Sequence, residues 1–251
     1  MSTIFDLTGK VAIVTGANTG IGQAIALSLA AAGADIAAVG RTPAEETVEK
    51  VRALGRKAEI VSADLSSIEP VQRVVDETIE KLGGLDILIN NAGIIRRADS
   101  VDFTEEDWDA VIDTNLKSTF FLAQAAGRHM LAQGSGKIVN IASLLSFQGG
   151  IRVPSYTASK SGVAGLTKLL ANEWAAKGVN VNAIAPGYIA TNNTAALQAD
   201  ETRNRQIQER IPAGRWGDPS DIGGAAVFLA SAAANYIHGH VLAVDGGWLA
   251  R

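Results

Sequence analysis

A tyrosine and a lysine four residues apart have the side-chain types that acid–base catalysis uses. Tyr156 and Lys160 share one face of a predicted helix, because residues at this spacing lie one above the other. A phenol with a pKa of about 10 exchanges protons poorly at neutral pH, and lowering that pKa by about three units takes about 4 kcal/mol. An ammonium group about 4 Å away supplies energy of that order at an effective dielectric constant of about 20. Lys160 is therefore predicted to activate Tyr156, with Ser143, which follows a predicted strand, beside them.

A glycine-rich turn follows the first predicted strand. Glycines permit positive φ angles and let backbone N–H groups approach a phosphate, which the start of the next helix also attracts. The spacing TGxxxGIG differs from the general GxGxxG fingerprint, and a turn with a purely structural role stays open as an alternative. We predict a dinucleotide site made by Thr15, Gly16, Asn18, Thr19, Gly20, Ile21 and Gly22.

The end of the second predicted strand indicates which dinucleotide binds. NAD sites usually carry an acidic residue here for the ribose hydroxyls, but this chain has Gly40 and Arg41. Glycine leaves room for a 2′-phosphate and arginine can pair with it bidentately, so NADP is favoured. The alternative is that Arg41 is a solvated residue and the chain uses NAD.

Polar residues follow two further strands. Asp64, with its neighbour Leu65, comes after the third predicted strand, and Asn91, Ala92 and Gly93 come after the fourth. Each set can be read as a turn, because Asx residues favour turns. One bound dinucleotide explains all of these strand ends together, so we add these residues to the predicted site.

The elements that must position these residues alternate between apolar runs and helical periods. This pattern predicts an α/β fold, a Rossmann-type doubly wound parallel sheet of about seven strands with helices on both faces. The predicted strands are 11–15, 35–39, 58–62, 86–90, 137–142, 180–185 and 240–244, and the predicted helices are 21–32, 44–54, 71–82, 105–133, 155–176 and 219–232. The helix over 105–133 is expected to bend or break near Asn115.

No linker divides the 251 residues, so we expect one domain over 1–251. Residues 186–212 form a long polar excursion after a strand end, where open α/β sheets place ligand contacts, and we expect a mobile substrate lid there. The net charge of −4 argues against nucleic acid or a membrane surface as a partner. No run of about 18 apolar residues predicts a membrane span, and we expect a cytoplasmic protein.

Several features of the sequence occur together: the motifs TGxxxGIG and NNAG, Asn115, Ser143 and the segment Tyr156–Lys160. With this combination the chain resembles the short-chain dehydrogenase/reductase family over nearly its whole length. The resemblance implies an NAD(P)-dependent oxidoreductase acting on an alcohol or ketone, in which Ser143 polarises the oxygen and Tyr156 exchanges the proton. It implies that Lys160 also holds the nicotinamide ribose and that Asn115 anchors a water in the proton relay. It further implies coenzyme contacts at Pro186, Gly187, Ile189 and Thr191, and a homotetramer.

Arginines near the expected site suggest an anionic substrate. Arg152 precedes Tyr156 by four residues, and Arg96 and Arg97 follow the NNAG turn. Guanidinium groups hold carboxylates bidentately, although surface arginines often have no such role. We predict that the substrate contacts Arg96, Ser143, Gln148, Arg152 and Tyr156.

Longer segments, among them residues 146–156 and 211–217, resemble a group within the family that acts on deoxy sugar acids. That group is commonly associated with NAD, so Gly40 and Arg41 leave the choice of coenzyme open. A 3-oxoacyl-thioester reductase or a general ketone or polyol reductase is the alternative enzyme, and a dinucleotide-binding sensor is the alternative outside catalysis. His238 and His240 lack a third nearby ligand and the chain has no cysteine, so we expect no metal.

Overall fold

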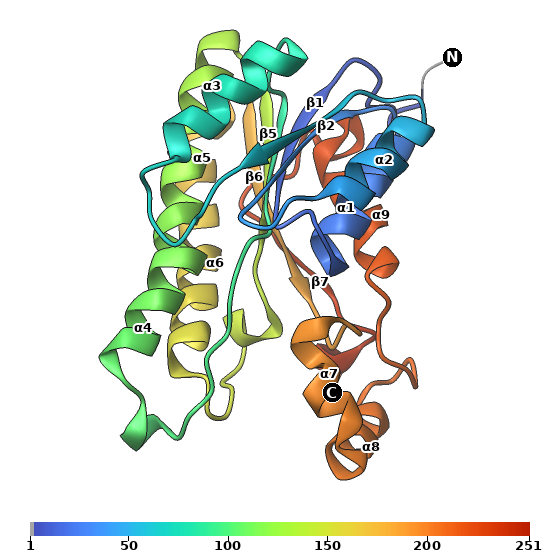
Figure 1. Cartoon of the computed structure of the whole chain (residues 1–251). Helices are drawn as coiled ribbons and strands as arrows, with labels where there is room; N and C mark the ends of the chain where they lie inside the picture. The colour runs from blue at the N-terminus through green and yellow to red at the C-terminus, as the bar shows by residue number, and fades with distance from the viewer. Residues whose placement is uncertain (1–2) are drawn as a thin grey trace.

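The computed structural model describes residues 3–251, in which seven parallel strands form a sheet with helices on both faces (Figure 1). The strand order is β3-β2-β1-β4-β5-β6-β7, which is the doubly wound order. Strands β2 and β3 extend the sheet on one side of β1, and β4 to β7 extend it on the other. The strands are β1 Val11–Thr15, β2 Asp35–Gly40, β3 Ala58–Ser62, β4 Ile87–Asn90, β5 Gly136–Ile141, β6 Val179–Pro186 and β7 Val241–Val244.

The central strand β1 shows why the sheet is covered on both sides. Its five residues are all buried, since successive side chains point to opposite faces and each face meets helices. Ala12 and Val14 enter one hydrophobic core with α1, α2 and α9, whereas Val11 and Ile13 enter a second core with α3, α5 and α6. The two layers lie on either side of the sheet in Figure 1.

The α-helices are α1 Gly20–Ala31, α2 Glu45–Ala53, α3 Val71–Leu82, α4 Glu105–Ile112, α5 Ser118–Gln133, α6 Pro154–Trp174, α7 Ala195–Ala199, α8 Glu201–Arg210 and α9 Ser220–Ala230. Short 3₁₀ turns occupy Ser100–Asp102, Leu144–Ser146, Ala175–Lys177, Asn192–Thr194, Ala232–Ala234 and Trp248–Ala250. Among the described residues, no helix is long and apolar enough to cross a membrane.

A π-helical turn over Asp113–Lys117 joins α4 to α5. The expected interruption near Asn115 is therefore confirmed, and its form is one wider helical turn inside an otherwise continuous helix. The turn buries Asn115, which is 1% exposed, so that the amide faces the protein interior. Wider turns of this kind are frequent at functional sites.

The polar excursion after β6 contains two short helices, α7 and α8, which the sequence pattern did not predict. They rest on a small separate core in which Ile207 and Ile211 pack with Leu144, Trp216 and Trp248. The other predicted elements are present, and their ends agree with the prediction or differ from it by one or two residues, where helix ends fray or strand pairing stops.

Candidate active site

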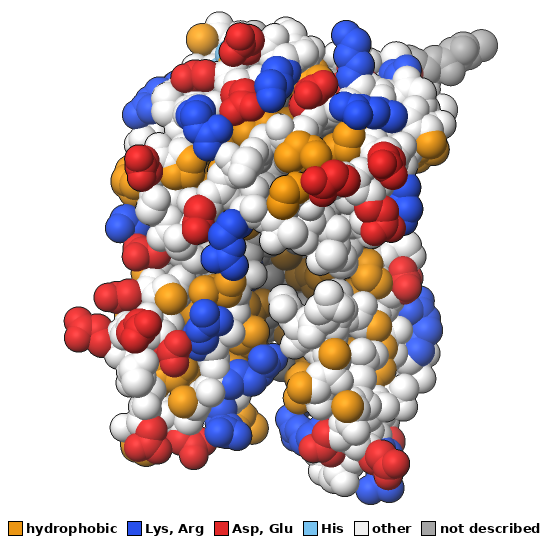
Figure 2. All heavy atoms as spheres, in the orientation of Figure 1, with side chains coloured by type: hydrophobic (Ala, Val, Ile, Leu, Met, Phe, Trp, Pro, Cys, Tyr) orange, Lys and Arg blue, Asp and Glu red, His pale blue; other side chains and the backbone are white. Residues whose placement is uncertain are grey.

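A cleft of about 910 Å³ lies along the carboxyl ends of the strands, between these strand ends and α7 and α8. Figure 2 shows the hollow, with Lys and Arg side chains on both of its sides. Its lining includes these expected site residues: Gly16, Asn18, Thr19, Gly20, Ile21, Gly22, Arg41, Asn91, Ala92, Gly93, Ser143, Gln148, Tyr156, Lys160, Pro186, Gly187 and Thr191. The sheet thus brings together strand ends that are far apart in the sequence.

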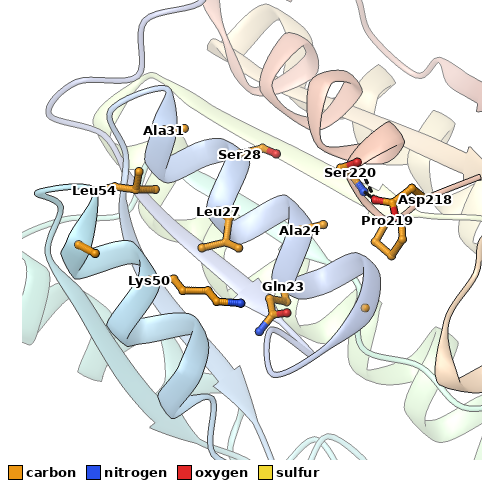
Figure 3. Close-up of a pocket in the computed structure, with 12 residues that line it drawn as sticks. Gln23, Ala24, Leu27, Ser28, Ala31, Lys50, Leu54, Asp218, Pro219 and Ser220 are labelled. Carbon is orange, nitrogen blue, oxygen red and sulfur yellow. Dashed lines mark hydrogen bonds between the residues drawn. The ribbon is translucent and has the colours of Figure 1, made fainter.

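A second, shallower groove lies on the outer side of α1, where this helix meets α2 and α9 (Figure 3). Gln23, Leu27, Lys50 and Asp218 line it. It shares Gly20 with the cleft but none of the expected catalytic side chains. The larger cleft is therefore the candidate active site.

The glycine-rich turn fits a dinucleotide because its backbone has no room for side chains. Gly16 and Gly20 have φ angles of 64° and 57°, which glycine adopts without strain. A Cβ atom on Gly22 would lie 2.1 Å from the carbonyl oxygen of Gly16, so the turn can close only around a glycine. The turn leads directly into the N-terminus of α1, whose first turn carries no acidic residue and so leaves its partial positive charge for a phosphate.

Thr15 fixes the turn after β1 to the turn after β4. Its hydroxyl accepts hydrogen bonds from the backbone N–H groups of Asn91 and Ala92 at 2.9 and 2.8 Å. The amide of Asn91 donates to the carbonyl of Thr15 at 2.9 Å. Thr15 is buried behind the cleft wall, so it supports the cleft from beneath.

Arg41 lines the cleft beside the end of β2, and its guanidinium lies 3.9 Å from the carboxylate of Asp64. Hydrogen bonds from Ser66 hold the pKa of Asp64 below its usual range, and Arg41 adds a smaller contribution. Gly40, Asp64 and the buried Leu65 do not line the cleft themselves. An exposed guanidinium with one long carboxylate contact can still pair with a phosphate.

Tyr156, Ser143 and Lys160 come together at the middle of the cleft, where β5 ends and α6 begins. Burial raises the pKa of Tyr156, whereas its hydrogen bond with Ser143 and the positive charge of Arg97 lower it. The Ser143 hydroxyl also accepts a hydrogen bond from the backbone N–H of Leu145 at 3.2 Å, which holds its orientation. The phenol and the hydroxyl are thus in position to share one substrate oxygen.

Lys160 lies beside the Tyr156 ring. Its Nζ is 5.6 Å from the centre of that ring, and it donates a hydrogen bond to the carbonyl oxygen of Ile141 at 2.6 Å. Burial lowers the pKa of Lys160 to about 8. Arg97 contributes a further positive charge, which lowers the pKa of the phenol.

Asn115 lies beneath the cleft wall instead of lining it. Its side-chain amide donates to the carbonyl oxygen of Ile94 at 2.9 Å, and its amide oxygen accepts from the Ile94 N–H at 2.8 Å. It also reaches Ser159 on α6 at 3.3 Å. Asn115 thereby fastens the NNAG turn to the helix that carries Tyr156 and Lys160.

The segment after β6 is ordered by a local capping box in which Thr191 and Thr194 satisfy each other's backbone groups. The Thr194 hydroxyl also donates to the carbonyl oxygen of Ile189 at 2.7 Å. The side chain of Ile189 is buried in a hydrophobic core, and Ile189 is not among the residues that line the cleft.

Two of the arginines predicted to meet the substrate do not reach the cleft. Arg96 pairs with Asp107 at 3.1 Å, and Arg152 pairs with Asp99 at 2.9 Å. Arg97, Arg203 and Arg210 line the cleft instead. A neighbouring carboxylate pairs with each of the first two guanidinium groups, and their contact with a substrate stays a prediction.

The sequence argument missed the cationic face of α8. Arg203, Ile207 and Arg210 are spaced at intervals of four and three residues, which places them on one face of a helix. This spacing was the available signal. The low apolar content of the segment obscured it, because Ile207 is its one buried residue.

The comparisons with known proteins agree with this geometry. A family model described as enoyl-(acyl carrier protein) reductase matches residues 16–249. A 2-dehydro-3-deoxy-D-gluconate 5-dehydrogenase of Escherichia coli K12 is 59% identical over 248 residues, which cover 98% of each chain. The chain belongs to the short-chain dehydrogenase/reductase family. It is therefore an NAD(P)-dependent oxidoreductase, and its doubly wound sheet is the fold expected from the resemblance.

Two solved structures of this family are close in shape and carry a coenzyme. A provisionally named 2-deoxy-D-gluconate 3-dehydrogenase from Agrobacterium tumefaciens with bound NADP is 62% identical, with a TM-score of 0.92, covering 99% of this chain and 100% of that one. A gluconate 5-dehydrogenase from Burkholderia cenocepacia J2315 in complex with NADP and tartrate is 40% identical, with a TM-score of 0.94 and 98% coverage of both chains.

Proposed function

We propose that this chain transfers a hydride between NADP(H) or NAD(H) and a secondary hydroxyl or ketone of a deoxy sugar acid. The observation that carries the proposal is that Ser143, Tyr156 and Lys160 line a cleft that is also lined by guanidinium groups, those of Arg97, Arg203 and Arg210. A hydroxyl–phenol pair suits exchange of a proton at a substrate oxygen, and the cations suit a carboxylate. The names of the similar dehydrogenases support the same substrate class.

In this proposal the chain's own residues handle the proton and the coenzyme supplies the hydride chemistry. During oxidation, Ser143 donates a hydrogen bond to the substrate oxygen and Tyr156 takes the hydroxyl proton. Lys160 favours the ionised phenol and holds the nicotinamide ribose. Asn115 positions the NNAG turn and a water of the proton relay.

The coenzyme site fits the same residues. The glycine turn from Gly16 to Gly22 and the N-terminus of α1 are placed for the pyrophosphate. We assign Arg41, which lines the cleft, to a 2′-phosphate, and we keep Asp64 and Leu65 as predicted contacts on the adenine side, although neither lines the cleft. Pro186, Gly187, Ile189 and Thr191 complete the site at the nicotinamide end.

A coenzyme-coupled assay at 340 nm tests the function. The panel holds 2-dehydro-3-deoxy-D-gluconate, 2-deoxy-D-gluconate and D-gluconate, with an acetoacetyl thioester and neutral polyols as the competing substrates, each with both coenzymes. The expected result is turnover of the sugar acids with kcat/KM at least about 10-fold above the neutral polyols, given the usual strength of charged hydrogen bonds. Preference for the thioester would contradict the proposal.

We also propose a homotetramer located in the cytoplasm. Exposed apolar side chains support the assembly, since Trp108 on α4 and Leu169 on α6 are 40% and 46% exposed. Light scattering coupled to size-exclusion chromatography tests the subunit number, and a monomeric mass at micromolar concentration would contradict it.

A further inference from the structure

Helix α8 presents a cationic face to the cleft. Arg203, Gln206, Ile207 and Arg210 line it, and Ile207 anchors the helix to the small core beneath. The guanidinium of Arg203 already donates a hydrogen bond to Gln206 at 3.1 Å. Neither arginine pairs with a carboxylate within the described part of the chain, and Arg210 differs in that its side chain donates no hydrogen bond there.

The guanidinium of Arg210 lies over an aromatic ring. Its guanidinium carbon lies 4.0 Å from the centre of the Trp248 indole. Trp248 is 4% exposed, and its ring N–H donates to the side-chain oxygen of Gln148 on the opposite wall of the cleft at 3.3 Å. Stacking on an immobile indole restricts the guanidinium while leaving its N–H edge for a ligand.

The backbone that carries Arg210 is fixed from the other side by Arg251. Its guanidinium donates to the carbonyl oxygen of Arg210 at 3.1 Å and also to that of Glu209. The last carbonyl groups of a helix have no partner within the helix, and a cation there also complements the helix dipole. Arg251 therefore caps the last turn of α8, next to the backbone of Arg210.

Arg97 and Arg210 come to the cleft from different elements. Arg97 follows the NNAG turn, and its positive charge lowers the pKa of Tyr156, so it acts on the phenol. Arg210 is the last residue of α8, a helix that lies apart from α4 and α6 in Figure 1. In a sugar acid that reacts at carbon 5, three carbons separate the reacting carbon from the carboxylate, a span of roughly 5 Å at ordinary bond lengths.

We propose that Arg210 is a specificity-determining residue that binds the substrate carboxylate remote from the reacting carbon, with Trp248 and Arg251 as its positioning residues. The inference rests on the proposed sugar-acid activity and deepens it. Two N–H groups of the guanidinium donate to the two carboxylate oxygens, and the charge selects acids over their neutral analogues. A lysine lacks the planar fork and replaces this contact only in part.

The main experiment compares D-gluconate with D-gluconamide, in which a neutral amide replaces the carboxylate. Arg210→Gln should raise KM for gluconate by about 10- to 100-fold, the range for losing a charged hydrogen-bond pair, and change KM for gluconamide little. Arg210→Lys should fall between wild type and Gln. Arg205→Gln, on the same exposed helix but outside the cleft lining, is the matched control and should leave both substrates unchanged.

A second pair of variants separates positioning from general stability. Arg251→Gln should raise KM for gluconate more than for gluconamide while leaving kcat nearly unchanged, and Arg251→Lys should restore part of the loss.

Equal effects of Arg210→Gln on the acid and the amide would overturn the proposal, because Arg210 would then only shape the cleft. A selective loss for the acid in Arg97→Gln but not in Arg210→Gln would also overturn it.

Calorimetric titration of gluconate into the NADP-bound chain keeps this inference distinct from the proposed function. If wild type turns over no sugar acid but binds gluconate more tightly than Arg210→Gln does, the carboxylate site stands and the proposed reaction fails. If both bind gluconate equally, or wild type does not bind it, the assignment of Arg210 fails.

Discussion

The two walls of the cleft are built in different ways. One wall, the strand-edge region, consists of the turns after β1, β2, β4, β5 and β6 and rests on two large cores. The other wall, the helical region, consists of α7, α8 and Trp248–Arg251 and rests on a small core. In the strand-edge region the backbone itself forms the site, whereas in the helical region a few side chains do so. We therefore expect changes in the first region to affect binding and chemistry for every substrate, and changes in the second to alter which substrate is used.

The largest effect is expected at Tyr156. Replacing it by Phe removes the group that carries the proton, so kcat should fall at least about 100-fold in steady-state assays with saturating substrate. Tyr236→Phe is the control, because Tyr236 is fully exposed and away from the cleft. Nearly wild-type kcat in Tyr156→Phe would remove the phenol from the mechanism.

The backbone construction of the strand-edge region predicts a large effect at Gly22. An added methyl group meets the Gly16 carbonyl, so Gly22→Ala should weaken NADP binding at least about 10-fold and cost about 1–3 kcal/mol of unfolding free energy. Gly84→Ala is the control, since a Cβ there meets no atom within 4 Å. Fluorescence titration and chemical denaturation measure the two quantities, and unchanged coenzyme affinity would show that the turn has room to relax.

Coenzyme choice should depend on one side chain of the strand-edge region. Arg41→Ala should lower the ratio of kcat/KM for NADP to that for NAD by about 10- to 100-fold, because the 2′-phosphate loses a charged partner. Asp64→Asn removes the carboxylate 3.9 Å from Arg41 and should keep or raise that ratio. A ratio that stays the same in Arg41→Ala would show that the arginine does not contact the coenzyme.

The pH dependence of kcat/KM should show whether the charge of Lys160 lowers the pKa of Tyr156. A positive charge favours the ionised phenol, so Lys160→Met should move the rising limb of kcat/KM for oxidation to higher pH by about one unit or more. In the wild type, the positive charge of Lys160 stabilises the ionised phenol at pH values below the Lys160 pKa of about 8, and this stabilisation is lost above that pH. Lys168→Met, on the exposed face of α6, is the control. Superimposable profiles would assign the effect to Arg97 alone.

The smallest effect is expected at an arginine outside both walls. Arg152→Leu should change the ratio of KM for gluconate to KM for gluconamide by less than about twofold, because its guanidinium pairs with Asp99 on the surface. A selective loss of the acid would restore Arg152 as a substrate contact and weaken the contrast with Arg210.

Most of the sheet could be predicted because the apolar pattern of each segment agrees with the burial of its side chains in the fold. The strands over 11–15 and 58–62 and the helix over 71–82 have the predicted bounds, since apolar period and burial coincide. The helix α8 could not be predicted with the same ease, because it buries a single apolar residue and its stability comes from contacts with Trp248 and Arg251, about 40 residues away.

The position of the motif residues at the cleft could be predicted because they follow strands, and the carboxyl ends of parallel strands lie at one edge of the sheet. The direction in which an arginine side chain extends is not fixed in this way. Arg96 and Arg97 are adjacent, yet one pairs with Asp107 and the other lines the cleft. That choice depends on which acids the neighbouring loops bring near, and no pattern within a single sequence states it.

The π-helical turn between α4 and α5 has a consequence for how the chain can vary. Because one residue adds about 100° of rotation in a helix, deleting a residue from Asp113–Lys117 would turn Asn115 away from Ile94 or rotate all of α5 against the sheet. Side chains on the outer surface of these helices are free to change, but the number of residues between Glu105 and Ser118 is not. Insertions and deletions in related chains should therefore avoid this stretch and collect in the loops on either side of it.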